Sequence, residues 1–225
     1  MNFFKYYILR KRYTISDLQD PRTALNATDR NLVKILIVDD DVFNHEDRLR
    51  RLGFNIQKYD DIESLEAAEA FQVIICDVKG VGKKFGSQIE GAFVLDQLKK
   101  AYPMKEYAVY SSSLYNSEMT TALQGISIIN KDQPSEDWCN DVDSLIRKVT
   151  NPKLIWQKIA FKMIENNIPT RVIQKVEHEF VECVRDKAGD FTGFPSSKCL
   201  SDVDGDVSGI IHSLIAGIVL LPISI

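Results

Sequence analysis

Two continuous apolar runs, each closed by acidic residues, most constrain how this chain can fold. The run KILIV occupies residues 34–38 and is followed by three aspartates at 39–41, and the run FQVIIC leads to Asp77. Strands with one solvated face alternate apolar and polar residues, whereas a continuous β-branched run suits a strand buried on both faces of a parallel sheet. The sequence therefore predicts a parallel α/β sheet with acidic groups at the carboxyl ends of two strands.

The segments around these runs alternate between helix and strand patterns. Gly53 and Gly125 follow two of the predicted helices and are typical helix terminators. Strands are expected at 34–38, 54–60, 71–77, 107–111 and 126–130, and helices at 42–52, 64–70 with a start a few residues earlier, 92–102, 116–124 and 134–149. Five β-α units therefore predict one domain over residues 34–150.

Residues 151–225 are predicted to form a separate helical region. Pro152 disfavours continuation of the preceding helix, and helices are expected at 153–165 and 170–187, the second with Thr170 as a candidate N-cap. A polar stretch at 188–208 follows, and the chain ends on an apolar run at 209–225. Three states are open for that run: a membrane anchor, a segment buried on the main domain, or one that fills a partner's groove; membrane contact is not favoured because the run is short for a span.

Residues 1–33 are predicted to be an N-terminal extension. Its first segment interleaves aromatic and basic residues but lacks the apolar core and cleavage site of a signal peptide. Packing of this extension on the main domain is favoured over a membrane-surface or RNA contact.

Charge and cysteine content exclude several classes of protein. A formal net charge of −4 at pH 7 argues against binding of nucleic acid through the overall field, and no helix has the pattern of a DNA-recognition helix. The 4 cysteines form no C-x-x-C pair, which fits reduced, buried thiols in a cytoplasmic protein and disfavours zinc.

The acidic residues are expected to meet at one place. Ligands of open parallel sheets bind outside the carboxyl ends of the strands, so the aspartates at 39–41 should lie near Asp77. Carboxylates without histidine or cysteine favour Mg²⁺, which prefers one or two carboxylates together with phosphate oxygens. Ser111 or Ser112 after the fourth strand and Lys131 after the fifth could bind phosphoryl oxygens at the same edge.

Four short motifs in register resemble the signature of response-regulator receiver domains. They are VDDD at 38–41, IICD at 74–77, VYSS at 109–112 and IINK at 128–131. The resemblance covers residues 34–150. It implies a doubly wound, flavodoxin-like sheet of five parallel strands in the order 2-1-3-4-5, to which a small α-helical C-terminal region is attached.

The resemblance implies a role for each motif residue. Asp77 would be the phosphoacceptor. Mg²⁺ would be held directly by Asp40 and Asp77, through water by Asp39, and by the backbone carbonyl of Lys79. No organic cofactor site is expected.

The same resemblance implies the charge partners and the protein partners. Lys131 would pair with the acceptor carboxylate and then with the phosphoryl group, and Ser111 would turn its hydroxyl inward. The phosphoryl donor would be a histidine kinase or a phosphotransfer protein, the output protein is unknown, and a homodimer is an open alternative. The chain would be a two-component signalling protein and no enzyme beyond its own phosphorylation and dephosphorylation. A receiver-fold scaffold that binds partners without phosphorylation is the alternative.

Three positions depart from the receiver pattern. The loop at 79–90 is lengthened, and its lysines are interpreted as solvated. Ile128 stands where receivers usually have an aromatic residue, and Asp132 replaces the proline that usually follows the lysine.

Two other site patterns fail on spacing. The sequence GVGKKFGS lacks P-loop spacing, and the acidic residues at 202–206 lack the glycine position and closing glutamate of a calcium loop, so a flexible acidic turn is expected there. A phosphohydrolase is disfavoured because Lys79 stands where the second acid would be needed.

Overall fold

The fold is described from a computed structural model, which covers residues 12–20, 24–111 and 117–223. All five predicted strands are present, and they form one parallel sheet in the order β2-β1-β3-β4-β5. Their bounds are β1 Lys34–Val38, β2 Asn55–Tyr59, β3 Val73–Asp77, β4 Glu106–Ser111 and β5 Ser127–Asn130. The predicted fold class and strand order are confirmed.

Helical segments cover both faces of the sheet, as continuous apolar strands require. Two hydrophobic clusters lie on opposite faces: one includes Ile35, Ile75 and Trp138, and the other includes Leu36, Ile74 and Leu95. The covering segments are α2 Glu46–Arg51 and α5 Ser135–Thr150 on one side, and the 3-10 turn η2 Leu65–Ala68 with α3 Glu90–Ala101 and α4 Ser117–Ala122 on the other.

Two predicted helices are shorter or different in kind. The helix expected at 42–52 begins only at Glu46, because the preceding residues form a loop in which the backbone N–H of Asp41 donates to Asp39 Oδ1 over 3.0 Å. The helix expected at 64–70 is a single 3-10 turn, and Phe71 N–H closes on the carbonyl of Ala68 over 3.2 Å.

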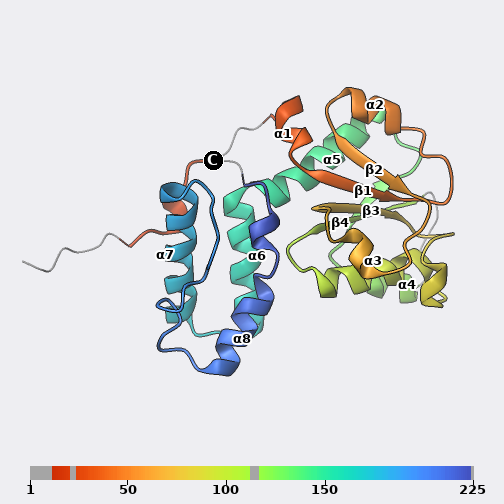
Figure 1. The fold of residues 1–225 in the computed structure, drawn as a ribbon. Helices are drawn as coiled ribbons and strands as arrows, with labels where there is room; N and C mark the ends of the chain where they lie inside the picture. Colours follow the sequence, from red (N-terminus) through yellow and green to blue (C-terminus); the bar gives the residue numbers. More distant parts are fainter. Residues whose placement is uncertain (1–11, 21–23, 112–116, 224–225) are drawn as a thin grey trace, which may run out of the picture.

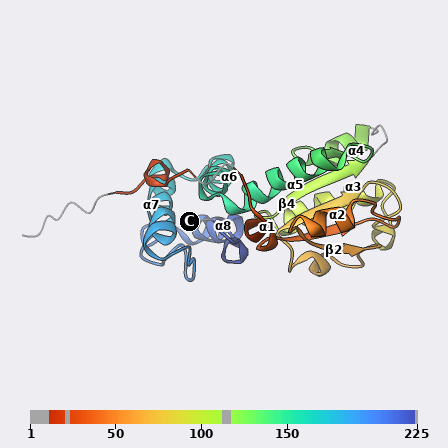
Figure 2. The same ribbon diagram turned by 90° about the horizontal axis from the view of Figure 1, so that it is seen from above.

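The remaining helices form a layer beside the sheet (Figures 1 and 2). They are α6 Pro152–Glu165, α7 Thr170–Asp186 and α8 Gly205–Leu214, with the short turns η1 Ile15–Asp17 and η4 Ile218–Leu220. The short helix α1 Ala27–Asn31 instead lies against the sheet domain, where Arg30 pairs with Asp143 of α5. Only Asn151 separates α5 from α6, and its side chain caps α6 by accepting from Lys153 N–H over 2.9 Å. Thr170 is the first helical residue rather than the N-cap, a position taken by Pro169.

This helical layer meets the sheet where the strands begin. Lys158 of α6 donates to Glu106 Oε1 and to the carbonyl of Lys105, each over 2.7 Å, at the start of β4. Gln72, just before β3, donates to the carbonyl of Leu220 over 3.3 Å. The sheet and the helical layer share one hydrophobic cluster that runs from Ile35 to Phe180.

The C-terminal apolar run is part of that cluster. Ile211 is 0% exposed, and Ile215, Ile218 and Leu221 are also buried. The run is buried, as one of the three predicted states has it, but α8 packs against α6 rather than on the main domain, which the run meets through the bond from Gln72 to the carbonyl of Leu220. Among the described residues, no helix is long and apolar enough to cross a membrane.

The structure refines two expectations for the outer parts of the chain. The N-terminal extension has two contacts: the N–H groups of Tyr13 and Ile15 donate to His178 Nδ1 and Glu177 Oε1 of α7 over 2.9 Å each, whereas Arg30 pairs with Asp143 of α5 over 2.8 Å, so the part around α1 packs on the main domain as expected. Residues 1–11 lie outside the described part. The acidic turn at 202–206 is the start of α8, with Asp204 as its N-cap.

The cysteines carry no disulfide. All four are free, as predicted, but only Cys76 and Cys183 are buried, whereas Cys139 in α5 and Cys199 in the loop before α8 are half-buried.

The docked state of α8 predicts different effects for two neighbouring isoleucines. Ile211→Ala should lower the free energy of unfolding by about 2–4 kcal/mol, because it leaves a cavity in the core. Ile210→Ala, at a residue that is 37% exposed, should change it by about 0.5 kcal/mol or less. Urea unfolding measures both, and equal losses would contradict the docking of α8.

Candidate functional site

Two carboxylates lie at the carboxyl ends of adjacent strands and share the ammonium of Lys131. Asp39 follows β1 and is 0% exposed, and Asp77 ends β3 and is 7% exposed. Each follows a run of apolar strand residues that are buried on both faces of the sheet. The two carboxylates are therefore attached to backbone that lies inside the protein. A buried carboxylate is costly unless charges or hydrogen bonds compensate it.

Asp77 is compensated on both oxygens. Lys131 Nζ donates to Oδ2 over 2.8 Å, and the backbone N–H of Val78 donates to Oδ1 over 2.6 Å. A longer bond of 3.4 Å comes from Lys79 N–H to Oδ1. The carboxylate is thus fixed in orientation between an ammonium and the turn that follows β3.

Lys131 reaches both carboxylates from the end of β5. Its ammonium lies 3.9 Å from Asp39 Oδ1 and 5.1 Å from the centre of the Tyr110 ring. Burial alone would lower the pKa of Lys131, but the hydrogen bond to Asp77 and the nearby carboxylate charges outweigh it, so the pKa is raised. Lys131 is therefore a cation at neutral pH.

Tyr110 is a site residue that the sequence did not reveal. Its hydroxyl donates to Asp39 Oδ2, and its ring is 1% exposed. Burial, followed by the hydrogen bond to Asp39, raises the pKa of Tyr110 well above its ordinary value, so the hydroxyl stays protonated and remains a donor. Because Tyr110 pairs with Asp77 in the β3–β4 register, a register argument could have placed it at this edge.

The acidic cluster provides a set of oxygen ligands. One oxygen each from Asp39, Asp40 and Asp41 lie within 4.8 Å of one another. Carboxylates with no histidine or cysteine in the group fit a hard cation such as Mg²⁺. The backbone of Gly80 presses on the Asp40 carboxylate so closely that a Cβ at this position would collide with it.

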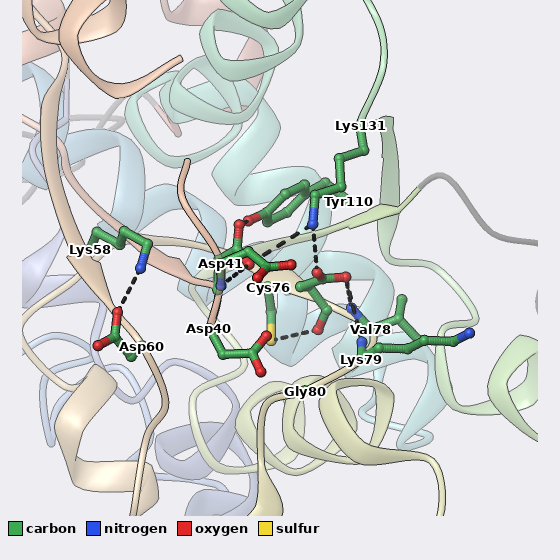
Figure 3. Close-up of polar contacts among 12 residues, drawn as sticks. Asp40, Asp41, Lys58, Asp60, Cys76, Val78, Lys79, Gly80, Tyr110 and Lys131 are labelled. Carbon is green, nitrogen blue, oxygen red and sulfur yellow. Dashed lines mark hydrogen bonds and ion pairs between the residues drawn. The ribbon is translucent and has the colours of Figure 1, made fainter. Parts of the chain in front are cut away.

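Lys79 and Ser111 lie at the sheet edge where the sequence places them. Lys79 is in the turn after Asp77, and its side chain points away from the carboxylates (Figure 3). Ser111 is half-buried at the end of β4, opposite Asn130 of β5. Ser112, the alternative hydroxyl, lies outside the described residues.

The lengthened loop is held by two carboxylates, one from outside the loop and one at its end. Asp61 accepts from Gly82 N–H over 2.5 Å and from Lys83 N–H over 3.3 Å, and Glu90 Oε2 accepts from Gly80 N–H over 2.7 Å. A Cβ on Gly91, which follows the loop, would collide with the carbonyl of Asp77. The loop is thus fixed against the end of β3.

The loop lysines are exposed, as expected, but they are not free in solvent. Lys83 is 66% exposed at its side chain and pairs with Asp40 Oδ2 over 3.2 Å. Lys84 is 60% exposed and pairs with Glu63. Both side chains are therefore exposed to solvent, as expected, and each also forms a surface ion pair.

The other two departures lie at the rim of the site. Ile128 is 62% exposed on β5. Asp132 is exposed, and its backbone N–H donates to Asn130 Oδ1 over 3.0 Å, while Lys131 keeps its pair with Asp77.

His45 connects the site to α5. Its ring stacks on Trp138 at 5.1 Å, its Nδ1 lies 3.2 Å from Ser135 Oγ, and it also hydrogen bonds to the backbone of Lys131. Burial lowers the pKa of His45, and the bond to Lys131 opposes that shift. The loop after β1, the loop after β5 and the start of α5 are therefore joined through one ring.

No protein-family model matches the chain, and no curated protein matches it either. Solved structures that resemble it are response-regulator proteins, mostly their receiver domains. NtrX from Brucella abortus is 20% identical with a TM-score of 0.43, and the match covers 62% of this chain and 30% of that one. A CheY-like receiver domain protein from Methanospirillum hungatei is 18% identical with a TM-score of 0.44 and coverages of 52% and 94%. A response regulator from Thermotoga maritima is 16% identical with a TM-score of 0.41 and coverages of 51% and 97%.

The bond between Tyr110 and Asp39 predicts a measurable loss of stability. Tyr110→Phe keeps the ring packing but removes a donor to a buried carboxylate, so the free energy of unfolding should fall by about 1.5–3 kcal/mol. Tyr59→Phe is the matched control, because that hydroxyl accepts from exposed Gln57 on the edge strand rather than donating to a buried carboxylate, and it should change stability by about 0.5 kcal/mol or less. Equal losses in urea unfolding would show that the bond to Asp39 contributes nothing.

Proposed function

We propose that this chain is a phosphoacceptor of a two-component or phosphorelay system, in which Mg²⁺-dependent phosphorylation of Asp77 switches a protein–protein interaction. The observation that carries the proposal is the contact of Lys131 with Asp77 at 2.8 Å beside the acidic cluster at 39–41. A carboxylate with a fixed ammonium and a set of oxygen ligands has the parts that phosphoryl transfer needs, since this reaction depends on position and charge rather than on a strong base.

The proposed step moves a phosphoryl group from a phosphohistidine of the partner to a carboxylate oxygen of Asp77. The N–P bond breaks, its electron pair stays on the imidazole nitrogen, and an O–P bond forms. Lys131 holds the acceptor before transfer and balances the phosphoryl charge afterwards. Ser111, at the same sheet edge, would donate its hydroxyl to a phosphoryl oxygen.

The residues that would hold Mg²⁺ are Asp40, Asp77 and the carbonyl of Lys79 directly, and Asp39 through water. The ion would supply charge neutralisation on the phosphoryl oxygens. Tyr110 and Lys131 keep Asp39 in a fixed orientation, so this carboxylate would not need to reorganise when an ion binds.

The proposal also covers the domain organisation. Residues 34–150 would form the phosphoacceptor unit, residues 1–33 an extension, and residues 151–225 a helical region attached at the opposite end of the sheet. The donor would be a histidine kinase or a phosphotransfer protein. A phosphate adds about −1.5 to −2 charges at pH 7, enough to bias a two-state contact.

The second candidate is a receiver-fold scaffold that binds partners without phosphorylation. The ion pair between Lys83 and Asp40 favours it, because a lysine already neutralises one of the carboxylates that a metal ion would need. The two candidates differ in one property: only the first requires a response to Mg²⁺ together with a phosphoryl analogue.

Beryllofluoride, which mimics the phosphoryl group on an aspartate, separates them. With Mg²⁺ it should raise the thermal unfolding midpoint of the wild type, since a ligand at 100 times its dissociation constant stabilises by about 2.7 kcal/mol. Asp77→Asn should remove the response, because the acceptor oxygen is lost. Asp132→Asn, at an exposed carboxylate near the site, should retain it. A wild type without response, or an equal response in Asp77→Asn, would favour the scaffold.

A further inference from the structure

Lys83 is the one loop lysine among the described residues that reaches the acidic cluster. The loop is held from two sides, because Asp61 accepts from the N–H groups of Gly82 and Lys83 and Glu90 accepts from the N–H of Gly80. These bonds fix the backbone that leads into the turn at Lys83. The position of its side chain near Asp40 is therefore a consequence of the loop geometry.

The contact itself lies on the carboxylate that the proposed function assigns to the metal. Lys83 Nζ is 3.2 Å from Asp40 Oδ2, while the backbone of Gly80 lies against the same carboxylate. Lys131 approaches the cluster from the other side, on Asp77 and Asp39. Two ammonium groups from different parts of the chain thus share the negative charge of the site.

We propose that Lys83 is a tethered cation that competes with the divalent ion for Asp40, so that the lengthened loop sets the metal affinity of the site. This inference rests on the proposed function, because it takes Asp40 as a metal ligand. A metal ion can bind Asp40 only after Lys83 has left Oδ2 or has shared the carboxylate. The ammonium has a free path to leave, since its side chain is 66% exposed.

The size of the effect follows from the exposure of the pair. Exposed ion pairs contribute about 0.2–1 kcal/mol. Releasing such a pair before metal binding therefore weakens binding by up to about fivefold, because 1.36 kcal/mol corresponds to a factor of ten. Salt screens the exposed pair, so the competition should fade as ionic strength rises.

A matched pair of lysine variants tests the inference in the full-length chain. Lys83→Met removes the ammonium on Asp40, whereas Lys84→Met removes the same charge from the next residue, whose partner is Glu63. Loss of the lysine charge should change the long-range attraction of Mg²⁺ to a similar extent in both variants. The difference between their Mg²⁺ affinities therefore measures the contact of Lys83 with Asp40. Mg²⁺ is titrated alone, with tryptophan fluorescence and the thermal unfolding midpoint as readouts at low and high salt.

We expect Lys83→Met to bind Mg²⁺ about two- to fivefold more tightly than Lys84→Met at low salt, and the difference to shrink at high salt. Lys83→Arg should bind like the wild type, because it restores a cation at the same place. Binding by Lys83→Met alone would also support the inference.

Two outcomes would overturn it, and they are distinguishable. Equal Mg²⁺ affinities of the two methionine variants would remove the role of Lys83 and leave the proposed function intact. An absence of Mg²⁺ binding in the wild type and in both variants would overturn the proposed function, and the inference with it.

Discussion

Burial of two neighbouring carboxylates is the constraint on which the rest of this structure depends. Asp39 and Asp77 stand at the ends of two adjacent buried strands and are 0% and 7% exposed, so both carboxylates have lost most of their contact with bulk water. Their charge must be compensated by groups from other strands. Lys131 comes from the end of β5 and Tyr110 from β4, and both are in reach only because the strand order is β2-β1-β3-β4-β5. The site therefore depends on the strand order, because a different order would leave the carboxylates buried without compensating charges or donors.

The parts that could be predicted from sequence are those in which a local pattern determines a position in space. Continuous apolar runs identify parallel strands, and a parallel sheet brings every carboxyl end to one edge, so the convergence of Asp39, Asp77 and Lys131 followed without knowledge of side-chain geometry. The role of Tyr110 could not be predicted, because a tyrosine inside an apolar strand is normally a core residue. The contact of Lys83 with Asp40 could not be predicted, because it depends on the position of the loop. That position depends on Asp61, which is far away in sequence and accepts from backbone N–H groups of the loop.

The errors in helix assignment have the same physical origin. Helix propensity favoured a start at residue 42, but the loop that carries the aspartates uses residues 42–45 to turn away from β1, and the helix begins only after His45. Thr170 has the chemistry of an N-cap, yet Pro169 already has the extended backbone of that position. The stretch at 188–208 looked polar, although Phe191 and Phe194 pack on Phe180 and fill the helical layer. In each case tertiary contacts overrode a weak local preference.

The site and the helical layer lie at opposite ends of the sheet, which limits how one could influence the other. The carboxylates are at the carboxyl ends of the strands, whereas Lys158 and Leu220 contact the strand beginnings. One covering helix spans this distance: α5 has 16 residues, a length of about 24 Å at 1.5 Å per residue. Its first turns contact the site through His45 and Trp138, and its last residue is followed by Asn151 and then α6. A displacement of the first turn of α5 can pass along this rigid helix to α6, because a single residue separates the two helices. The described part of the C-terminal run contacts the sheet where β3 begins, away from the carboxylates. Any coupling between the acceptor and the helical layer would therefore have to pass through α5 or through the sheet itself.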